Sequence, residues 1–462
     1  MYPVSLAQIA EVTGGRLSQV PDLAVTVTGR AVIDSRQARA GDLFCAFDGA
    51  AVDGHAFAET AVRAGAAAVL ASRDVPVPSI VVPDVTAALA RLAGWSARQM
   101  TGTRIGITGS SGKTSAKDLL GQVLPGDGTL VTEGSQNNEL GVPLTVLRAD
   151  EATRYLVLEM GARGVGHIAY LCDIALPKIA VVLNVGRAHS GEFGSLDATA
   201  AAKGELPAAV PSDGFAVLNA DDARVAGMAA RTRGTVVTFG LGPDADVRAT
   251  DVSPDGLGRP CFTLRIAGSE AKVRLRLLGT HHVYNALAAA AVAHALGMSL
   301  DDIAARLSDA VAVTGGRMQL MERPDGVAVI DDAYNANPDS MNASLEALAA
   351  MRAGGRRIAV IGEMKELGAS SPAEHRAVGE VAGKLGIDLV VAVGGDDAAQ
   401  VAAGAQDAGA DARLVPGREA ARELLEGHRL GTGDVVLVKA SLAAGLRALA
   451  ADLAGRVSAD GH

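Results

Sequence analysis

Cysteine is scarce in this sequence. The three cysteines, Cys45, Cys172 and Cys261, lie far apart and form no CxxC pair. That spacing argues against a disulfide framework and against a cysteine-based zinc site. We therefore expect a protein of a reducing compartment, the cytoplasm.

Long hydrophobic runs and excess positive charge are also missing. No apolar stretch reaches the roughly 20 residues that cross a bilayer, and the N-terminal MYPVSLAQIAEVTGGRL lacks the basic patch and apolar core of an export signal. We expect no membrane contact. The 42 basic residues are outnumbered by 52 acidic ones, which argues against a protein that coats nucleic acid. A few local cations and backbone N–H groups still suffice to bind a compact anion.

The chain is long and apolar enough for several packed cores. It has 462 residues, of which 49% are hydrophobic, and at roughly 150 residues per domain this length predicts about three domains. We place them at residues 1–100, 101–314 and 315–462. Lysine supplies only eight of the basic residues. A lysine at a chemically suggestive position is then more informative than usual, because a titratable amine differs from a guanidinium.

The pattern of apolar runs predicts an α/β fold in the first of these parts. Short strand-like runs occupy 25–36 and 42–49, and helix-like stretches occupy 55–72 and 85–100. This part contains no glycine-rich phosphate loop. We expect a mixed α/β domain.

The remaining parts predict two further α/β sheets. From residue 104 strands and helices alternate, as in a parallel sheet that helices cover on both faces. A hairpin is expected within 246–278, a long Ala-rich helix at 283–296, and a less regular stretch from there to residue 318. The last part restarts the alternation, which predicts a Rossmann-like open sheet.

The strongest motif is a glycine-rich turn between a predicted strand and a predicted helix. In such a turn backbone N–H groups cradle phosphates, the lysine reaches the terminal phosphate and the next hydroxyl faces Mg²⁺. Ile107 stands where the usual pattern has its first glycine, yet GKT in this context favours nucleotide binding over a chance turn. The turn consists of Thr108, Gly109, Ser110, Ser111, Gly112, Lys113, Thr114 and Ser115.

Three residues of the central part each have an ordinary structural interpretation, and two of them also suit a metal site. Glu159 ends a predicted strand, where a carboxylate suits Mg²⁺ but a helix cap explains it equally well. His189 follows the next strand; a lone histidine is more often structural, although a neutral imidazole beside a nucleotide can complete a metal shell. Lys203, taken alone, is interpreted as a solvent-exposed lysine on a helix.

Clusters of polar residues follow further along the chain. Asn137 and Asn138 either make a turn or contact phosphate or a sugar. His281, His282 and Asn285 open a predicted helix, where each can act as a cap and Asn285 can also read a purine edge. In the last part, five polar residues are expected in the turn after a strand: Asp331, Asp332, Tyr334, Asn335 and Asn337. A capped turn would explain any one of them but explains so many together less well.

Together these motifs resemble those of the Mur ligases, the ATP-dependent amide ligases of cytoplasmic peptidoglycan precursor synthesis. Residues 32–66 resemble the UDP-binding domain that the last two enzymes of that series share. At two positions the chain departs from the family: Gln136 replaces an aromatic residue next to the cleft, and His282 replaces an asparagine. The similar segments span nearly the whole chain in the family's order: TGSSGKTS, NNELGVPLTVL, LEMGARGVGHI, NVGRAHSGEFGS, AKGEL, GTHHVYNALAAAAVA, GGRMQ, DDAYNANPDSM, GEMKELG and VLVKAS.

The resemblance implies a particular reaction. YNANP and NNELGVPLTVL are similar to the member that joins D-alanyl-D-alanine to UDP-N-acetylmuramoyl-tripeptide. In that reaction ATP phosphorylates the terminal carboxylate of the tripeptide, and the amine of D-alanyl-D-alanine displaces the phosphate through a tetrahedral intermediate. Positioning and charge neutralisation dominate such chemistry, and closure of the three domains keeps water from the acyl phosphate. We expect a monomer.

The resemblance also implies roles for individual residues. Lys113 would stabilise the γ-phosphoryl group, and Thr114 with Glu159 would hold Mg²⁺. His189 and Lys203 would hold a second metal, with Lys203 carbamylated, because nearby positive charge lowers the pKa of an amine and exposes it to CO₂. Further nucleotide contacts would come from Asn285, Arg317 and, at the ribose, Asp332. Substrate contacts would come from Asp34, Ser35, Arg36, Asn137, Asn138, Asn335 and Lys439.

Three alternative functions remain at this stage. The nearest is the related ligase that adds the third amino acid, although its Asp-Asn-Pro-Arg motif does not occur in this sequence. A folylpolyglutamate synthase is disfavoured because the N-terminal segment is typical of nucleotide-sugar binding. A P-loop protein without ligase activity leaves the YNANP cluster unexplained.

Overall fold

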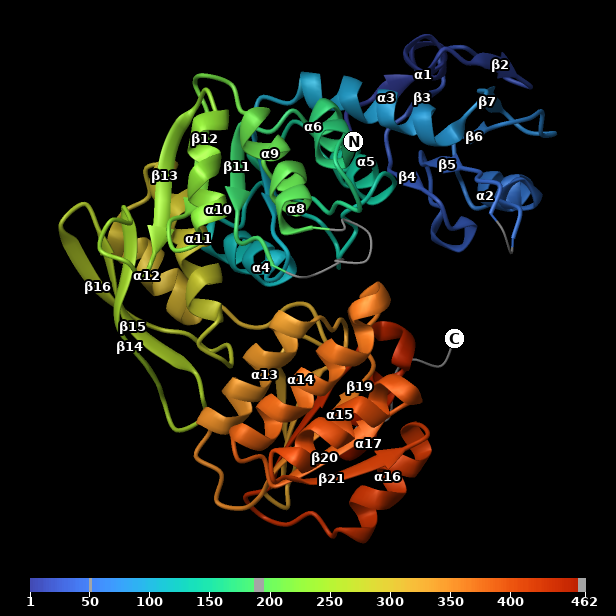
Figure 1. Ribbon diagram of the computed structural model, residues 1–462. Coiled ribbons are helices and arrows are strands. Elements are labelled where there is room, and N and C mark those ends of the chain that lie inside the picture. The colour runs from blue at the N-terminus through green and yellow to red at the C-terminus, as the bar shows by residue number, and fades with distance from the viewer. Residues whose placement is uncertain (50–51, 187–194, 456–462) are drawn as a thin grey trace.

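Four β-sheets organise the chain in this computed structural model, which describes residues 1–49, 52–186 and 195–455. In Figure 1 the N-terminal part, in blue, lies beside the central part, and the C-terminal part, in orange and red, lies below the central part. None of the described helices is both long and apolar enough to span a membrane. All three cysteines are free thiols.

The N-terminal part contains two of the sheets. β1 (Val4–Ser5) pairs antiparallel with β3 (Thr26–Val27), and a five-stranded sheet has the order β2-β7-β6-β5-β4. Its strands from β4 to β7 are parallel, and β2 is antiparallel to β7. Their bounds are β2 (Arg16–Ser18), β4 (Ala31–Val32), β5 (Leu43–Cys45), β6 (Ala68–Ala71) and β7 (Ser79–Val81), and the helices are α1 (Leu6–Thr13), α2 (Ala58–Arg63) and α3 (Val85–Gln99).

The prediction of one helix over 55–72 is wrong. A 3₁₀ turn at Gly54–Phe57 and the short α2 are followed by Gly65, whose φ of 112° lies outside the helical region. The apolar run after it forms β6, and all four residues of that strand are buried in the sheet. Burial in the sheet therefore outweighs the helical preference of its alanines.

The central sheet has nine strands in the order β16-β15-β14-β13-β12-β11-β8-β10-β9. Neighbouring strands from β9 to β14 are parallel, and the last three form an antiparallel extension that includes the expected hairpin. Their bounds are β8 (Thr103–Thr108), β9 (Thr129–Val131), β10 (Tyr155–Glu159), β11 (Ile179–Val182), β12 (Phe215–Asn219), β13 (Thr235–Gly240), β14 (Val247–Pro254), β15 (Pro260–Ile266) and β16 (Ser269–Arg274).

Helices cover both faces of this sheet. Leu156 and Leu158 of β10 pack with α3, α5 and α6, which also belong to the core shared with the N-terminal part. Val157, on the opposite face of the same strand, packs with α4, α11 and α12. The described helices here are α4 (Lys113–Val123), α5 (Gly141–Val146), α6 (His167–Ala175), α8 (Leu196–Lys203), α9 (Glu205–Ala208), α10 (Ala223–Ala226), α11 (His282–Ala295) and α12 (Leu300–Asp309).

The expectation of a less regular stretch before residue 318 is wrong in part. It contains α12, a helix of ten residues. Ser299 caps this helix by accepting a hydrogen bond from the Asp302 N–H, and Ile303 and Leu307 are buried on one face. A serine cap followed by apolar residues four apart is a helix signal that the sequence carried.

The C-terminal part has a six-stranded sheet of order β17-β18-β22-β19-β20-β21. All pairs are parallel except the edge pair of β17 with β18. Asp331 and Asp332, expected in the turn after a strand, are the last residues of β18 itself. The strands are β17 (Gln319–Glu322), β18 (Ala328–Asp332), β19 (Arg357–Gly362), β20 (Leu389–Val393), β21 (Asp411–Val415) and β22 (Val435–Lys439), and the helices are α13 (Pro338–Ala350), α14 (Ser371–Lys384), α15 (Asp396–Asp407), α16 (Arg418–Gly427) and α17 (Leu446–Leu453).

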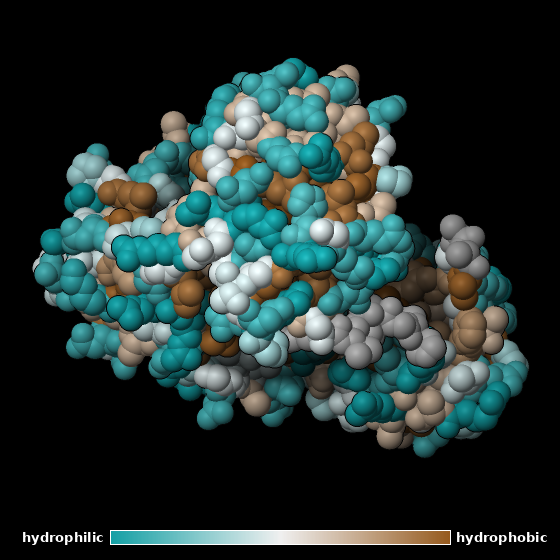
Figure 2. Space-filling view, turned by 90° about the horizontal axis from the view of Figure 1, so that it is seen from below, coloured by the Kyte–Doolittle hydropathy of each residue, from teal (hydrophilic) through white to brown (hydrophobic). Residues whose placement is uncertain are grey.

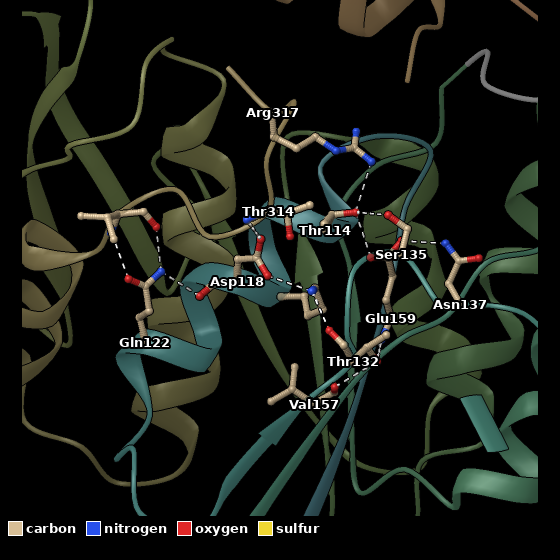
Figure 3. A network of polar contacts seen from close by, with 12 residues as sticks. Thr114, Asp118, Gln122, Thr132, Ser135, Asn137, Val157, Glu159, Thr314 and Arg317 are labelled. Atoms are coloured by element: carbon tan, nitrogen blue, oxygen red, sulfur yellow. Dashed lines mark hydrogen bonds and ion pairs between the residues drawn. The ribbon is translucent and has the colours of Figure 1, made fainter. Parts of the chain in front are cut away.

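The contacts between the central part and the C-terminal part include the interdomain linker and a hairpin, besides the cavity described below. The linker after α12 is held on α4, where Gln122 bonds both the N–H and the C=O of Val311 and the Asp118 carboxylate accepts from the Thr314 N–H (Figure 3). The tip of the β14–β15 hairpin reaches α13, and its Gly256 C=O accepts from the Arg352 N–H at 3.2 Å. Figure 1 shows this hairpin extending down to the C-terminal part.

The face of the molecule that is seen from below Figure 1 carries both hydrophobic and hydrophilic residues. In Figure 2, hydrophobic residues form small separate patches among hydrophilic ones on this face. Single apolar side chains on a surface are normal in a folded protein and by themselves indicate no binding site.

A buried ion pair beside the phosphate loop gives a stability prediction. The Lys117 side chain is 2% exposed, and its Nζ atom lies 2.8 Å from both the Asp118 carboxylate and the Thr132 C=O. Replacing Lys117→Met leaves a largely buried carboxylate without its cation, so we expect the free energy of unfolding of the central part to fall by about 3 kcal/mol. The midpoint of urea unfolding measures this change.

The matched control is Lys178→Met, which breaks the exposed pair of Lys178 with Asp213. We expect a change below about 1 kcal/mol, because water screens that pair. An equal loss in the two variants would show that burial of Lys117 does not decide its contribution.

Candidate active site

The central strand order explains where the functional residues gather. β8 lies between β10 and β11, and all three strands run in the same direction. Their carboxyl ends therefore meet at one edge, the place where open α/β sheets bind ligands. Residue 107 is paired with Glu159, and Thr108 with Val182. The glycine-rich turn follows β8 and leads into α4, as the sequence predicted.

A cavity of about 580 Å³ opens at this edge. The central part contributes the phosphate loop, the turn at 135–139, the end of β10 and the start of α6, and the C-terminal part contributes the segment before and at the start of α13. Predicted site residues that line it are Ser110, Ser111, Gly112, Lys113, Thr114, Ser115, Asn137, Asn138, Glu159, Lys203, Arg317 and Asn335. Residues that sequence reasoning did not select also line it: Ser135, Glu139, Arg163, His167, Tyr170, Ser340 and Glu366.

The Glu159 carboxylate is the centre of a hydrogen-bonded cluster (Figure 3). Its Oε2 atom accepts from the Thr114 hydroxyl at 2.9 Å, and its Oε1 atom accepts from the Asn137 amide at 2.7 Å. Glu159 is 1% exposed. The two residues predicted to share Mg²⁺ are thus neighbours, and hydroxyl and carboxylate oxygens are donors that this ion prefers. The Asn137 amide nitrogen is committed to Glu159.

Asn138 shapes the same turn. Its side-chain oxygen accepts from the backbone N–H groups of Leu140 and Gly141 at 3.3 and 2.9 Å. It therefore satisfies N–H groups at the start of α5 that have no partner within the helix. The side chains of Asn137 and Asn138 therefore both make hydrogen bonds within the protein, although both residues also line the cavity.

Two cations lie at the phosphate loop. Lys113 donates from Nζ to the Gly109 C=O at 2.7 Å, within the loop itself, and burial lowers its pKa while Glu159 opposes that shift. Arg317, from the linker after α12, points a guanidinium nitrogen at the Thr114 hydroxyl at 3.4 Å (Figure 3). Its guanidinium also lies 4.5 Å from the centre of the Tyr334 ring, a cation–π contact.

Lys203, the last residue of α8, is 4% exposed, so it is not a solvated helix lysine. Its pKa lies well below the ordinary value, first because of burial and second because of Lys113. The expectation that neighbouring positive charge lowers this pKa is confirmed for Lys113, and desolvation is a second and larger cause. Its side chain has no hydrogen bond or ion pair with another described residue. His189 lies outside the described residues.

Asp332 lies beside the cavity and does not line it. Its carboxylate is 2.8 Å from the Lys439 ammonium and accepts from the Ser344 hydroxyl and the Met318 N–H. Lys439 also donates to the Asn335 C=O at 2.9 Å. This pair is therefore fully engaged inside the C-terminal part in the structure.

The predicted Asp34-Ser35-Arg36 motif is not part of this cavity. It follows β4 in the N-terminal part, where Asp34 caps a short 3₁₀ turn by accepting from the Arg36 N–H at 3.0 Å. The Arg36 guanidinium lies 2.9 Å from the same carboxylate, and its side chain is 86% exposed. The structure thus separates these residues from the phosphate loop.

Gly112 gives a direct test of the loop geometry. Its φ is 80°, a region that side chains rarely adopt, and an added Cβ would collide with Oδ1 of Asn285. Because such backbone strain costs about 1–3 kcal/mol, we expect Gly112→Ala to weaken binding of ADP by at least about 10-fold, measured by calorimetry.

Gly126→Ala is the control for that variant. Gly126 lies in the same part of the chain, has no neighbour within 4 Å of an added Cβ and has no positive φ. It is expected to bind ADP like the wild type. Unchanged binding in Gly112→Ala would place the phosphates elsewhere.

Comparisons with known proteins identify relatives of the whole chain. Family models match the Mur ligase family catalytic domain at residues 31–95, the Mur ligase middle domain at 107–293 and the Mur ligase glutamate ligase domain at 316–442. A relative named UDP-N-acetylmuramoyl-tripeptide--D-alanyl-D-alanine ligase, from Mycobacterium tuberculosis, is 49% identical over 97% of each chain.

Solved structures give the same result. MurF from Acinetobacter baumannii has a TM-score of 0.87 at 33% identity and covers 99% of this chain and 100% of its own. MurF ligase from Thermotoga maritima, in complex with ADP, has a TM-score of 0.81 at 32% identity, with 93% of this chain and 98% of that chain covered. A three-part α/β fold, a phosphate loop at the carboxyl edge of a parallel sheet and this degree of identity lead to one conclusion: the chain belongs to the Mur ligase family.

Proposed function

We propose that the protein joins D-alanyl-D-alanine to UDP-N-acetylmuramoyl-tripeptide with ATP, in cytoplasmic peptidoglycan precursor synthesis. The observation that carries this proposal is the identity of 49%, over 97% of each chain, to a relative named for that reaction. The cavity supports it, because the phosphate loop and the YNANP segment of the C-terminal part face each other there. We also propose domain bounds at 1–100, 101–314 and 315–462, and a monomeric protein.

The residues of the cavity have complementary chemistry for the first step. The phosphate loop would hold ATP through its backbone N–H groups, and Lys113 and Arg317 would face the transferred phosphoryl group. Charge neutralisation and positioning are what this transfer needs most from a protein. Burial of Lys113 increases the strength of its interaction with developing negative charge.

Thr114 and Glu159 would hold one Mg²⁺. The fit rests on two oxygen donors 2.9 Å apart in a buried cluster that Asn137 orients. When bound, the ion would neutralise charge on the phosphate oxygens. Because Asn137 fixes the other oxygen of the same carboxylate, Glu159 keeps its orientation when the Thr114 hydroxyl turns away from it.

The N-terminal part would hold the UDP moiety. Arg36 offers an exposed cation beside Asp34 and Ser35, and a diphosphate is an anion that a guanidinium binds well. Asn335 and Lys439 would bring the C-terminal part's contacts to the bound substrates, and Asn285 and Asp332 would contact the nucleotide. For Asp332 this requires an exchange of one of its present partners.

The test of the function is product formation. We expect phosphate release and a UDP-linked pentapeptide, identified by mass spectrometry, only when ATP, Mg²⁺, the UDP-linked tripeptide and D-alanyl-D-alanine are all present. A parallel reaction supplies the UDP-linked dipeptide and a diamino acid and tests the neighbouring ligase activity. Turnover in that parallel reaction alone, or ATP hydrolysis indifferent to the amine, would contradict the proposal.

Lys203 provides the second prediction of this proposal. A buried amine with a lowered pKa is partly neutral, and its nitrogen can add to the carbon of CO₂ with loss of one proton, which gives a carbamate anion whose oxygens could bind a second metal. We expect Lys203→Ala and Lys203→Arg both to lower kcat by at least about 100-fold, because a guanidinium cannot form the carbamate. The exposed Lys178→Arg is the control and is expected to keep full activity.

A measurement independent of activity accompanies these variants. Wild-type protein in ¹³C-labelled bicarbonate should show one carbamate resonance that Lys203→Arg lacks. A bare amine at Lys203 in the wild type, or normal turnover in Lys203→Arg, would return this residue to a structural role.

A further inference from the structure

The start of α11 carries a contact that the proposed mechanism does not use. His282, the first residue of α11, is 3% exposed. Its Nδ1 atom lies 3.3 Å from the Asn285 side-chain nitrogen, one turn along the helix. An amide nitrogen can only donate, so Nδ1 accepts and the ring carries its proton on Nε2. Nε2 is buried without a partner among the described residues.

The other end of the Asn285 side chain faces the phosphate loop. Its Oδ1 atom occupies the space that a Cβ at Gly112 would need, and Asn285 is 5% exposed. The amide therefore has two fixed directions, with its nitrogen toward His282 and its oxygen toward Gly112. A rotated amide would set its oxygen against Nδ1 and would therefore require His282 to carry its proton on Nδ1, so the orientation of the amide is coupled to the tautomer of His282.

His282 also contacts the ring of the neighbouring His281. The rings of His281 and His282 lie 4.3 Å apart between centroids. Burial lowers the pKa of His281 to about 4, with Asp332 opposing that shift and Lys439 adding to it, and it lowers the pKa of His282 well below the ordinary value. Burial thus favours the neutral form of both rings, and a neutral His282 has one nitrogen without a proton, which can accept a hydrogen bond.

We propose that His282 is a positioning residue for the nucleotide: it fixes the Asn285 amide with its carbonyl oxygen against the phosphate loop. This inference rests on the proposed binding of ATP. The Oδ1 atom of an asparagine and the Nδ1 atom of a histidine lie at the same distance along the side chain and both can accept, so an asparagine at position 282 would conserve the hydrogen bond to Asn285.

The test compares ADP affinity, measured by calorimetry, in variants that keep or remove the acceptor. We expect His282→Leu to raise the Kd for ADP by about 10-fold, and His282→Asn to stay within about 2-fold of the wild type, on the scale of one neutral hydrogen bond. In steady-state kinetics His282→Leu should raise KM for ATP more than it lowers kcat.

A double-mutant cycle separates this role from simple packing. If His282 acts through Asn285, His282→Leu has no further effect on ADP affinity in an Asn285→Ala background. Val283→Ala is the matched control, because Val283 is buried at the next position of α11 and its truncation should lower thermal stability without changing the Kd. His282→Phe replaces His282→Leu if the latter does not fold.

The outcomes are distinct. Unchanged Kd in both acceptor-free variants, or additive effects in the cycle, would overturn the role of His282 while the wild type still binds ADP and makes product. A wild type that does not bind ADP would contradict the proposed function and this inference together.

Discussion

The parallel alignment of β8 with β10 and β11 is the constraint on which the rest of the site depends. It brings Thr108 at the start of the phosphate loop, Glu159 and the segment after Val182 to one edge of the sheet. The Thr114–Glu159 hydrogen bond then joins the first turn of α4 to the end of β10. Because this bond is buried, its partners have few alternative arrangements, and the loop is held in shape before any ligand arrives.

The second level of order comes from buried groups that orient one another. Asn137 holds Glu159, His282 holds Asn285, and Lys439 holds Asp332. In each case a hydrogen bond or ion pair from one buried side chain restricts the orientation of the next. Sites of this kind are precise because the supporting contacts come from regular elements and buried side chains.

The fold could be predicted from the sequence where periodicity and turn chemistry agreed. The apolar runs that became β8, β10, β18 and β19 are short and largely buried, and each ends in glycine or a polar residue, so their type was clear. At β6 the same apolar pattern was rich in alanine, which helices favour, and only its place inside a sheet decided its structure. Glu159 ends β10 and Thr114 follows β8 after the glycine-rich turn, and it was the family resemblance that implied a Mg²⁺ shared by the two. The commitment of Asn137 to Glu159 and the burial of Lys203 could not be predicted, since both depend on contacts between distant segments.

The hairpin tip at Gly256 has a mechanical consequence. The C-terminal part is attached to the central part at the linker after Thr314 and again where Gly256 meets Arg352, and Leu278, just after β16, belongs to a core cluster of the C-terminal part. Two rigid bodies that stay joined at two separated points retain one rotation, about the line through those points. A closure of the C-terminal part that keeps both attachments would have to turn about this line, which limits the paths open to the YNANP segment.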